Sequence, residues 1–205
     1  MNQFRLDLNA TRCAQAHQDA HCGKMLLELT QQLCGAFAEP RSGIRGGANG
    51  VHLGLTWPDA TPTERLNADL LPYAHTHRNH PCAVWTRATR ANFDSTIELA
   101  RALAVEFRHR FGKPHLSEAA LDWVVRHRAE AQAPDGPLQP FALAMPEEYQ
   151  YRYDDSLSVW DKPIVAYRAY YRAEKRGYWR KSRDPAKPST WVPAKWTKRD
   201  PPEWF

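Results

Sequence analysis

Apolar residues recur at intervals of three and four along several stretches of the chain, which is the pattern of amphipathic helices. The first stretch covers residues 11–37, and the second covers residues 81–111 and is ended by Gly112. A third helix is expected to begin after Ser117, a residue type that caps helices, and a fourth to end near Arg180. No alternating pattern persists long enough to indicate a sheet. The sequence therefore predicts a mainly α protein.

Glycine and proline interrupt these stretches and divide the chain. Residues 38–80 contain a glycine-rich run and a second irregular region, with one short helix expected at residues 63–71. Residues 3–9 are either a short strand or a lead-in to the first helix. A chain of 205 residues fits one compact domain. We expect a helical catalytic domain at residues 1–166, with an extended aromatic and basic C-terminal segment, residues 167–205, packed on it.

The positive charge of the protein is concentrated in this C-terminal segment. It has eleven Lys or Arg and four Asp or Glu, a charge of +7, so the rest of the chain carries −2 of the total of +5. Cations contact phosphates and flat rings stack on exposed bases, which indicates nucleic acid as the partner. The alternative is that many of the rings pack the segment onto the helices. The residues expected to contact DNA here are Arg172, Lys175, Arg176, Tyr171, Trp179 and Trp196.

The sequence also limits where the protein is expected to act. No window approaches the roughly 18 apolar residues of a membrane span, and the first residues lack the apolar core of a signal peptide. The four cysteines form no CxxC pair, and three lie in the first predicted helix, which favours reduced, buried thiols. We expect a monomeric protein of the cytoplasm, without membrane contact, metal or cofactor.

Four polar residues within the first helical stretch, His17, His21, Lys24 and Glu28, would share one helical face. Such a row is often only a solvated surface, but two imidazoles are unusual choices for that purpose. The carboxylate and imidazoles suit acid–base chemistry, and a lysine whose pKa is lowered by burial is a nucleophile. Two histidines four residues apart also suit one metal ion. A third ligand would then come from His75, His77 or His80.

The motif HTHRNHP, residues 75–81, precedes the second long helical stretch. Asn79 is the expected helix cap, and Pro81 fits the first turn. The positive end of a helix, together with His80, would form an anion site for a phosphate. Arg78 and Arg87 are the further cations that we expect to bind DNA here.

The order of the motifs LDLN, AHQDAHCGKMLLE, HRNHPCAVWTR, EFRHRFGKPH, AMPEEY, YRAYYRAEK and PEWF resembles a family of phage-encoded pyrimidine-dimer DNA glycosylases. Distant relatives of the endonuclease V type are all-α enzymes with a catalytic glutamate on an N-terminal helix. The resemblance implies that Glu28 is this glutamate and that residues 167–179 approach the DNA. It also implies a cofactor-free glycosylase, with possible AP-lyase activity, that acts on duplex DNA with a damaged pyrimidine in the host cytoplasm.

The nucleophile is where this sequence departs from that family. The endonuclease V type uses the amine that is exposed when the initiator methionine is removed, and removal requires a small second residue. Here the second residue is Asn2, so Met1 is expected to stay. The nucleophile is then the Met1 amine or Lys24, or lyase chemistry is absent. A terminal amine has a lower intrinsic pKa than a lysine, which favours Met1 if it reaches the site.

Three other functions fit the same residues. One is a phage DNA base-hypermodifying transferase that acts on a modified pyrimidine, and another is a nucleic-acid-binding protein without catalysis. The last is a metal hydrolase that uses the histidines.

Overall fold

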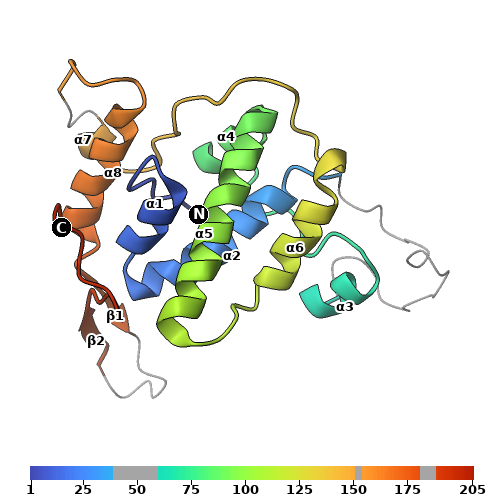
Figure 1. Cartoon of the computed structure of the whole chain (residues 1–205), viewed down its shortest axis with the longest axis horizontal. Helices are drawn as coiled ribbons and strands as arrows, with labels where there is room; N and C mark the ends of the chain where they lie inside the picture. The colour runs from blue at the N-terminus through green and yellow to red at the C-terminus, as the bar shows by residue number, and fades with distance from the viewer. Residues whose placement is uncertain (39–59, 151–153, 181–187) are drawn as a thin grey trace.

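The computed structural model describes residues 1–38, 60–150, 154–180 and 188–205 (Figure 1). Within these residues the chain is mainly helical, as predicted, with one two-stranded sheet. No helix among them is both long and apolar enough to cross a bilayer. The elements are α1 (Ala10–Ala16), α2 (Asp19–Cys34), α3 (Pro62–Asn67), α4 (Pro81–Ala88), α5 (Arg90–Phe111), α6 (Glu118–Arg126), the 3₁₀ helix η1 (Arg128–Glu130), α7 (Glu147–Gln150), α8 (Asp161–Glu174), β1 (Gly177–Arg180) and β2 (Thr190–Pro193).

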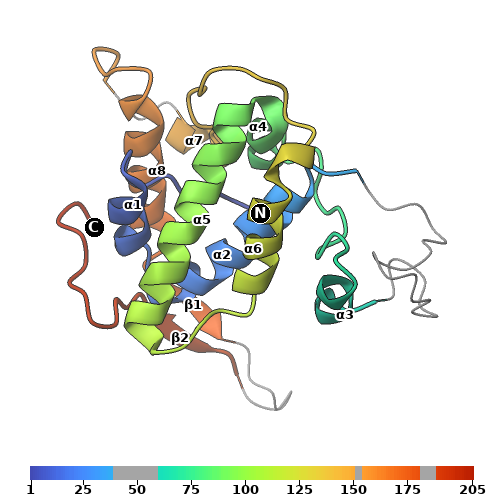
Figure 2. The ribbon, with the colours of Figure 1, turned by 45° about the vertical axis from the view of Figure 1, so that its right-hand side comes forward.

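Helices α2 and α5 cross at the centre of the protein, with α1 on one side of α5 and α6 on the other (Figures 1 and 2). Each turns its apolar face toward the core, because removing that surface from water is the main driving force for folding. The buried residues of this interface include Cys22, Met25, Leu26, Leu29 and Leu33 of α2 and Phe93, Leu99, Ala100 and Leu103 of α5. All four cysteines are free and buried, as predicted.

The N-terminal segment, residues 1–7, is extended, packs against the helices and forms no strand. Of the two expectations for residues 3–9, a short strand or a lead-in to the first helix, the second is confirmed. Its residues 3–6 are buried, so side chains from the helices must satisfy its backbone groups. The Leu6 N–H donates to Cys13 Sγ of α1 at 3.2 Å, and Arg168 Nε of α8 donates to the Leu6 carbonyl at 2.7 Å.

The prediction of one helix over residues 11–37 was wrong. Asn9 caps α1, but this helix stops after Ala16, and His17 is extended at φ −67° and ψ 135°. The reason is a buried arginine from α5. Arg110 Nη1 donates to the His17 carbonyl at 2.7 Å and Nη2 donates to the Gln15 carbonyl at 2.9 Å, which satisfies these helix-end carbonyls.

The second predicted helix is likewise divided in two, at Thr89. This residue is extended, with φ −143°, and its hydroxyl accepts a hydrogen bond from the Asn92 N–H at 3.1 Å, which caps α5. The same hydroxyl donates to the Pro137 carbonyl at 3.0 Å, so a distant segment fixes the break. The predicted end of the helix is confirmed, because Gly112 is left-handed at φ 68°.

The predicted fourth helix ends at Glu174 rather than at Arg180, and an antiparallel hairpin of β1 and β2 follows it. Gly177 begins β1. A Cβ atom there would lie 2.6 Å from the Trp191 ring and 2.4 Å from the Val192 carbonyl, so only glycine fits. The boundary expected between residues 166 and 167 falls inside α8, where Tyr167 is fully buried.

A buried ionic cluster joins the last residues of the chain to the core. Arg110 Nε lies 2.7 Å from Glu106 Oε1, and Arg110 Nη1 lies 3.1 Å from Asp19 Oδ1. Arg199 forms a second ion pair with Glu106 at 2.9 Å, and Thr197 donates to Asp19 through both its N–H and its hydroxyl. Arg110 therefore joins α5 to α2, and its partners Glu106 and Asp19 bind the C-terminal segment.

Replacing Arg110 with methionine should strongly destabilise the protein. The change leaves the Gln15 and His17 carbonyls without donors and Asp19 with one fewer partner, and breaking a buried pair from one side costs about 3–5 kcal/mol. Urea unfolding measures this loss. The control is Arg128→Met, which breaks the solvent-exposed pair with Asp94 and should cost at most about 1 kcal/mol. Equal losses in the two variants would contradict the role assigned to Arg110.

Candidate active site

Glu28 lies on α2 between two amines. Its Oε2 atom is 3.9 Å from the Met1 amine nitrogen, and its Oε1 atom is 3.5 Å from Lys24 Nζ. The carboxylate is mostly buried, whereas the Lys24 side chain is 63% exposed. Burial, the condition under which Lys24 was expected to become a nucleophile, is therefore not met. The structure brings together three of the predicted catalytic residues, Met1, Lys24 and Glu28.

Two residues one turn apart on α2 hold the beginning of the chain in place. The backbone N–H of Asn2 donates to Glu28 Oε2 at 2.7 Å, and Gln32 Nε2 donates to the Asn2 carbonyl at 3.2 Å. Gln32 also accepts a hydrogen bond from Gln3 Nε2 at 2.7 Å. The sequence reasoning missed Gln32, although its position four residues after Glu28 continues the polar row by one turn.

His80 borders this site from the N-terminus of α4. It, rather than the exposed Asn79, caps the helix, because its Nδ1 atom accepts a hydrogen bond from the Cys82 N–H at 3.2 Å. Partial burial and then the nearby positive amine of Met1 lower the pKa of His80, while the carboxylate of Glu28 opposes that shift. The Nδ1 atom is thus an acceptor, so a neutral His80 carries its proton on Nε2.

His17 lies outside α2 and does not share the predicted face, whereas His21 remains on α2 with Lys24 and Glu28. His17 follows α1 and is fully buried, with Nδ1 donating to the Cys13 carbonyl at 2.7 Å. His21 Nδ1 lies 2.8 Å from the Tyr171 hydroxyl, and its ring centroid is 4.9 Å from that of Phe4. Burial is the main cause that lowers the pKa of His17 to about 4 and that of His21 to about 3. Both are neutral packing residues near pH 7.

The metal alternative loses its geometric basis. It required His17 and His21 four residues apart on one helix, but the helix is broken between them. The Nε2 atom of His75 forms a hydrogen bond with the Phe37 carbonyl at 3.0 Å. In the described ranges no group of three or more His, Cys, Asp or Glu residues is placed to hold an ion.

Two cations that were predicted to bind DNA lie on or near α4. Arg78 is exposed just before the helix, and Arg87 lies in its last turn. Burial, and then the like charge of Arg78, lower the pKa of Arg87, which indicates that the two guanidinium groups are neighbours. Within the described part of the chain neither group has an ion-pair or hydrogen-bond partner, so both are available to an anion.

Two of the three aromatic residues predicted to stack on DNA are buried. Tyr171 is fully buried, and its hydroxyl accepts from the Gln18 N–H at 2.9 Å. Trp196 is also buried and donates from Nε1 to the Ala16 carbonyl at 3.0 Å. These two rings therefore pack the C-terminal segment onto the core, which was the alternative interpretation. The side chain of the third, Trp179, lies outside the described residues.

The exposed rings of the C-terminal segment are on the hairpin instead. Tyr178 is 43% exposed and Trp191 is 45% exposed. Arg172 and Arg176 are exposed nearby in sequence, and Lys175 Nζ lies 4.7 Å from the centroid of the Tyr170 ring. The predicted cations are thus at the surface, and a different pair of rings accompanies them.

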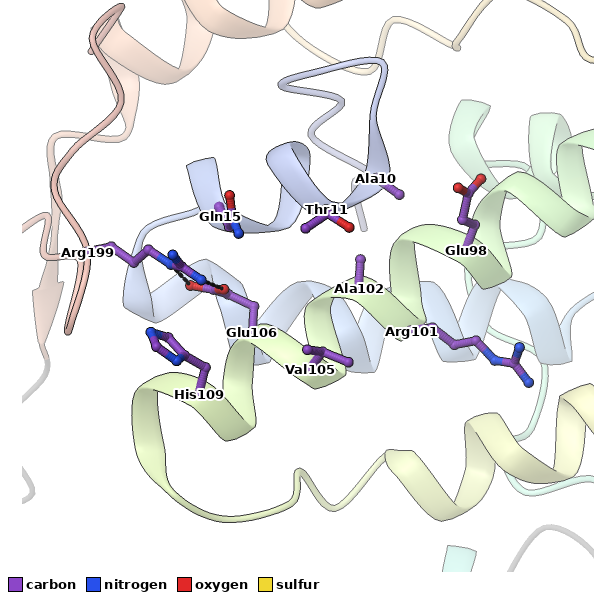
Figure 3. A pocket seen from close by; sticks show the side chains of 10 residues that line it. All are labelled: Ala10, Thr11, Gln15, Glu98, Arg101, Ala102, Val105, Glu106, His109 and Arg199. Atoms are coloured by element: carbon purple, nitrogen blue, oxygen red, sulfur yellow. Dashed lines mark hydrogen bonds and ion pairs between the residues drawn. The ribbon is translucent and has the colours of Figure 1, made fainter.

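A groove of about 350 Å³ lies between α1, α5 and the C-terminal segment (Figure 3). One end holds the Glu106–Arg199 ion pair, and Ala102 and Val105 contribute apolar surface. None of its lining residues belongs to the site around Glu28. The groove is therefore a separate feature of the surface.

The fold and this site define a mainly α protein in which the Met1 amine of an extended segment lies 3.9 Å from a carboxylate of the central helix α2. No family model, no curated protein and no solved structure matches the chain.

His17 and His21 should make the protein less stable in acid. Their pKa values of about 4 and about 3 in the folded state lie below the ordinary 6.5. Their contribution is therefore complete above pH 6.5 and is lost as the pH falls toward 4. A histidine with pKa values of 4 folded and 6.5 unfolded removes about 2 kcal/mol of unfolding free energy at pH 5. Urea unfolding between pH 7.5 and pH 5 measures the slope.

His21→Gln should unfold with a smaller dependence on pH than the wild type, although it is less stable at pH 7.5. His109→Gln is the control, because His109 is exposed on α5 and its replacement should leave the slope unchanged. An unchanged slope in His21→Gln would show that this histidine is not held neutral by burial.

Proposed function

We propose that the protein is a DNA glycosylase in which the Met1 amine is the nucleophile and Glu28 assists it. The observation that carries the proposal is the distance of 3.9 Å between the Met1 amine nitrogen and Glu28 Oε2. A carboxylate beside an amine can accept the proton that the amine loses when it attacks as a nucleophile. The motif resemblance to pyrimidine-dimer glycosylases supports the same role for Glu28. A DNA duplex with a damaged pyrimidine as substrate, a monomeric enzyme and a cytoplasmic location are parts of this proposal.

The chemistry requires an amine, a proton acceptor and a proton donor. The amine attacks C1′ of the deoxyribose, the bond from C1′ to the base breaks, and the base leaves with the electron pair and takes up a proton. The nitrogen then loses a proton, its lone pair forms the C=N bond of a Schiff base as the C1′–O4′ bond breaks, and O4′ keeps the electron pair and takes up a proton. Removal of a C2′ proton expels the 3′-phosphate by β-elimination, and water releases the amine. Glu28 is placed to take the proton from the attacking nitrogen.

The charge around the site suits a polyanionic substrate. Arg78 and Arg87 are available to backbone phosphates, and Lys24 extends the positive surface along α2. The hairpin presents the half-exposed rings of Tyr178 and Trp191 together with the cations of the C-terminal segment. In this proposal, the helical site performs the chemistry and the hairpin contributes to binding. Stacking of bases on such rings is typical of proteins that hold unpaired nucleotides.

Borohydride reduction on DNA with an abasic site or a cyclobutane pyrimidine dimer should trap a covalent protein–DNA adduct. The adduct should map to the Met1 peptide by mass spectrometry, which also shows whether the purified chain begins at Met1. Adding residues before Met1 should abolish trapping, because the amine becomes an amide. Lys24→Ala should lower the yield only severalfold. No adduct and no base release on either DNA, or an adduct at Lys24, would overturn the proposal.

Replacing Glu28 with glutamine should slow trapping by about 10²–10⁴-fold, the usual contribution of a general acid–base group. The matched control is Glu118→Gln. Glu118 has the same exposed side-chain fraction of 12% and also pairs with a cation, Arg108, but it lies on α6. Trapping by the control should equal that of the wild type. Equal loss in both variants would indicate general destabilisation rather than a role in the reaction.

A further inference from the structure

A connected set of hydrogen bonds runs from α8 to the first peptide of the chain. Tyr167 of α8 is fully buried, and its hydroxyl donates to the Ala142 carbonyl at 2.7 Å and accepts from the Ala144 N–H at 3.2 Å. The Ala144 carbonyl in turn accepts from Asn2 Nδ2 at 2.7 Å. One buried hydroxyl therefore fixes the backbone segment 142–144, to which the Asn2 side chain is bonded.

Asn2 uses all of its polar groups in this arrangement. Its side-chain oxygen accepts from the Gln3 N–H at 2.7 Å, its backbone N–H donates to Glu28 Oε2, and its carbonyl accepts from Gln32. The side chain of Asn2 is thus bonded to Ala144, and its backbone is bonded to α2. The amine of Met1 is one residue away, so its position follows from that of Asn2.

We propose that Asn2 is a positioning residue, which Tyr167 supports through Ala144, and that it sets the Met1 amine beside Glu28. This inference rests on the proposed function, but it concerns residues that do not touch the reacting atoms. An amine nucleophile gains most of its advantage from being held in a reactive geometry, because the entropic cost is met during folding. A backbone that pivots at residue 2 would lose that geometry while the fold remains.

The chain offers variants that remove these hydrogen bonds without changing side-chain volume much. Asn2→Leu removes the side-chain hydrogen bonds to Ala144, Gln3 and Cys82 and keeps a large second residue, so that Met1 stays. Tyr167→Phe removes only the hydroxyl. The controls are Gln150→Met, because Gln150 Nε2 donates to the Met145 carbonyl at 2.8 Å, and Tyr149→Phe, which loses the hydrogen bond to Glu174. The controls lose comparable bonds in neighbouring places that do not reach residue 2.

The test combines trapping kinetics on abasic-site DNA with NMR of the amide proton of residue 2. Asn2→Leu and Tyr167→Phe should lower the maximal trapping rate about tenfold or more while the DNA concentration for half-maximal rate stays unchanged. In both variants the amide proton of residue 2, protected in the wild type by Glu28, should exchange faster with solvent. The controls should match the wild type in both measurements.

The outcomes separate this inference from the proposed function. If the wild type forms an adduct and both variants trap at its rate with a protected amide, Asn2 does not position the amine. If the variants lose trapping only in proportion to a loss of folded protein, as measured by thermal unfolding, the role is structural and the inference fails. If the wild type forms no adduct but amide protection changes as expected, the proposed function fails, while the hydrogen-bonded anchoring of residue 2 stands.

Discussion

An extended segment buried inside a helical protein has no neighbouring strand to satisfy its backbone, and this constraint organises the structure. Side chains from three helices supply the missing partners for residues 1–7: Glu28 and Gln32 from α2, Cys13 from α1 and Arg168 from α8. An unpaired backbone group in the interior costs free energy comparable to a lost hydrogen bond, so these contacts fix the path of the segment. The Met1 amine is brought to Glu28 as a consequence of that path.

Polar side chains of α2 therefore stabilise the fold and also line the proposed catalytic site. Glu28 accepts a hydrogen bond from the Asn2 N–H and also lies beside two amines. Gln32, one turn later on α2, donates a hydrogen bond to the Asn2 carbonyl. A carboxylate held by a backbone N–H cannot rotate freely, so the oxygen beside Met1 keeps its position. In the proposed reaction this rigidity is an advantage, since little reorganisation is needed when charge develops on the attacking nitrogen. The groove beside Arg199, at some remove in the fold, shares none of these groups.

The division of the helices depends on residues that are distant in sequence. The carbonyls of Gln15 and His17 end α1 because Arg110, more than ninety residues later, donates to them. The hydroxyl of Thr89 caps α5 and also reaches the Pro137 carbonyl. Apolar periodicity passes through both breaks without interruption, because both flanking helices face the same core. This explains why the number of helices was underestimated and why His17 was placed on a face that it does not share.

The sequence by itself determined the mainly α class, the end of a helix at Gly112, the burial of the cysteines and the shared helical face of Lys24 and Glu28. Each of these follows from local spacing or from the conformational preference of single residues. Only the tertiary structure decided that His17, Tyr171 and Trp196 are buried, that His21 packs against Tyr171 and that Tyr178 and Trp191 are exposed. Amphipathic side chains such as histidine, tyrosine and tryptophan pack equally well in a core or at a surface, and their neighbours decide between the two. The meeting of Met1, Asn2 and Glu28 was decided in the same way, since no periodicity relates an extended segment to the helix it will cross.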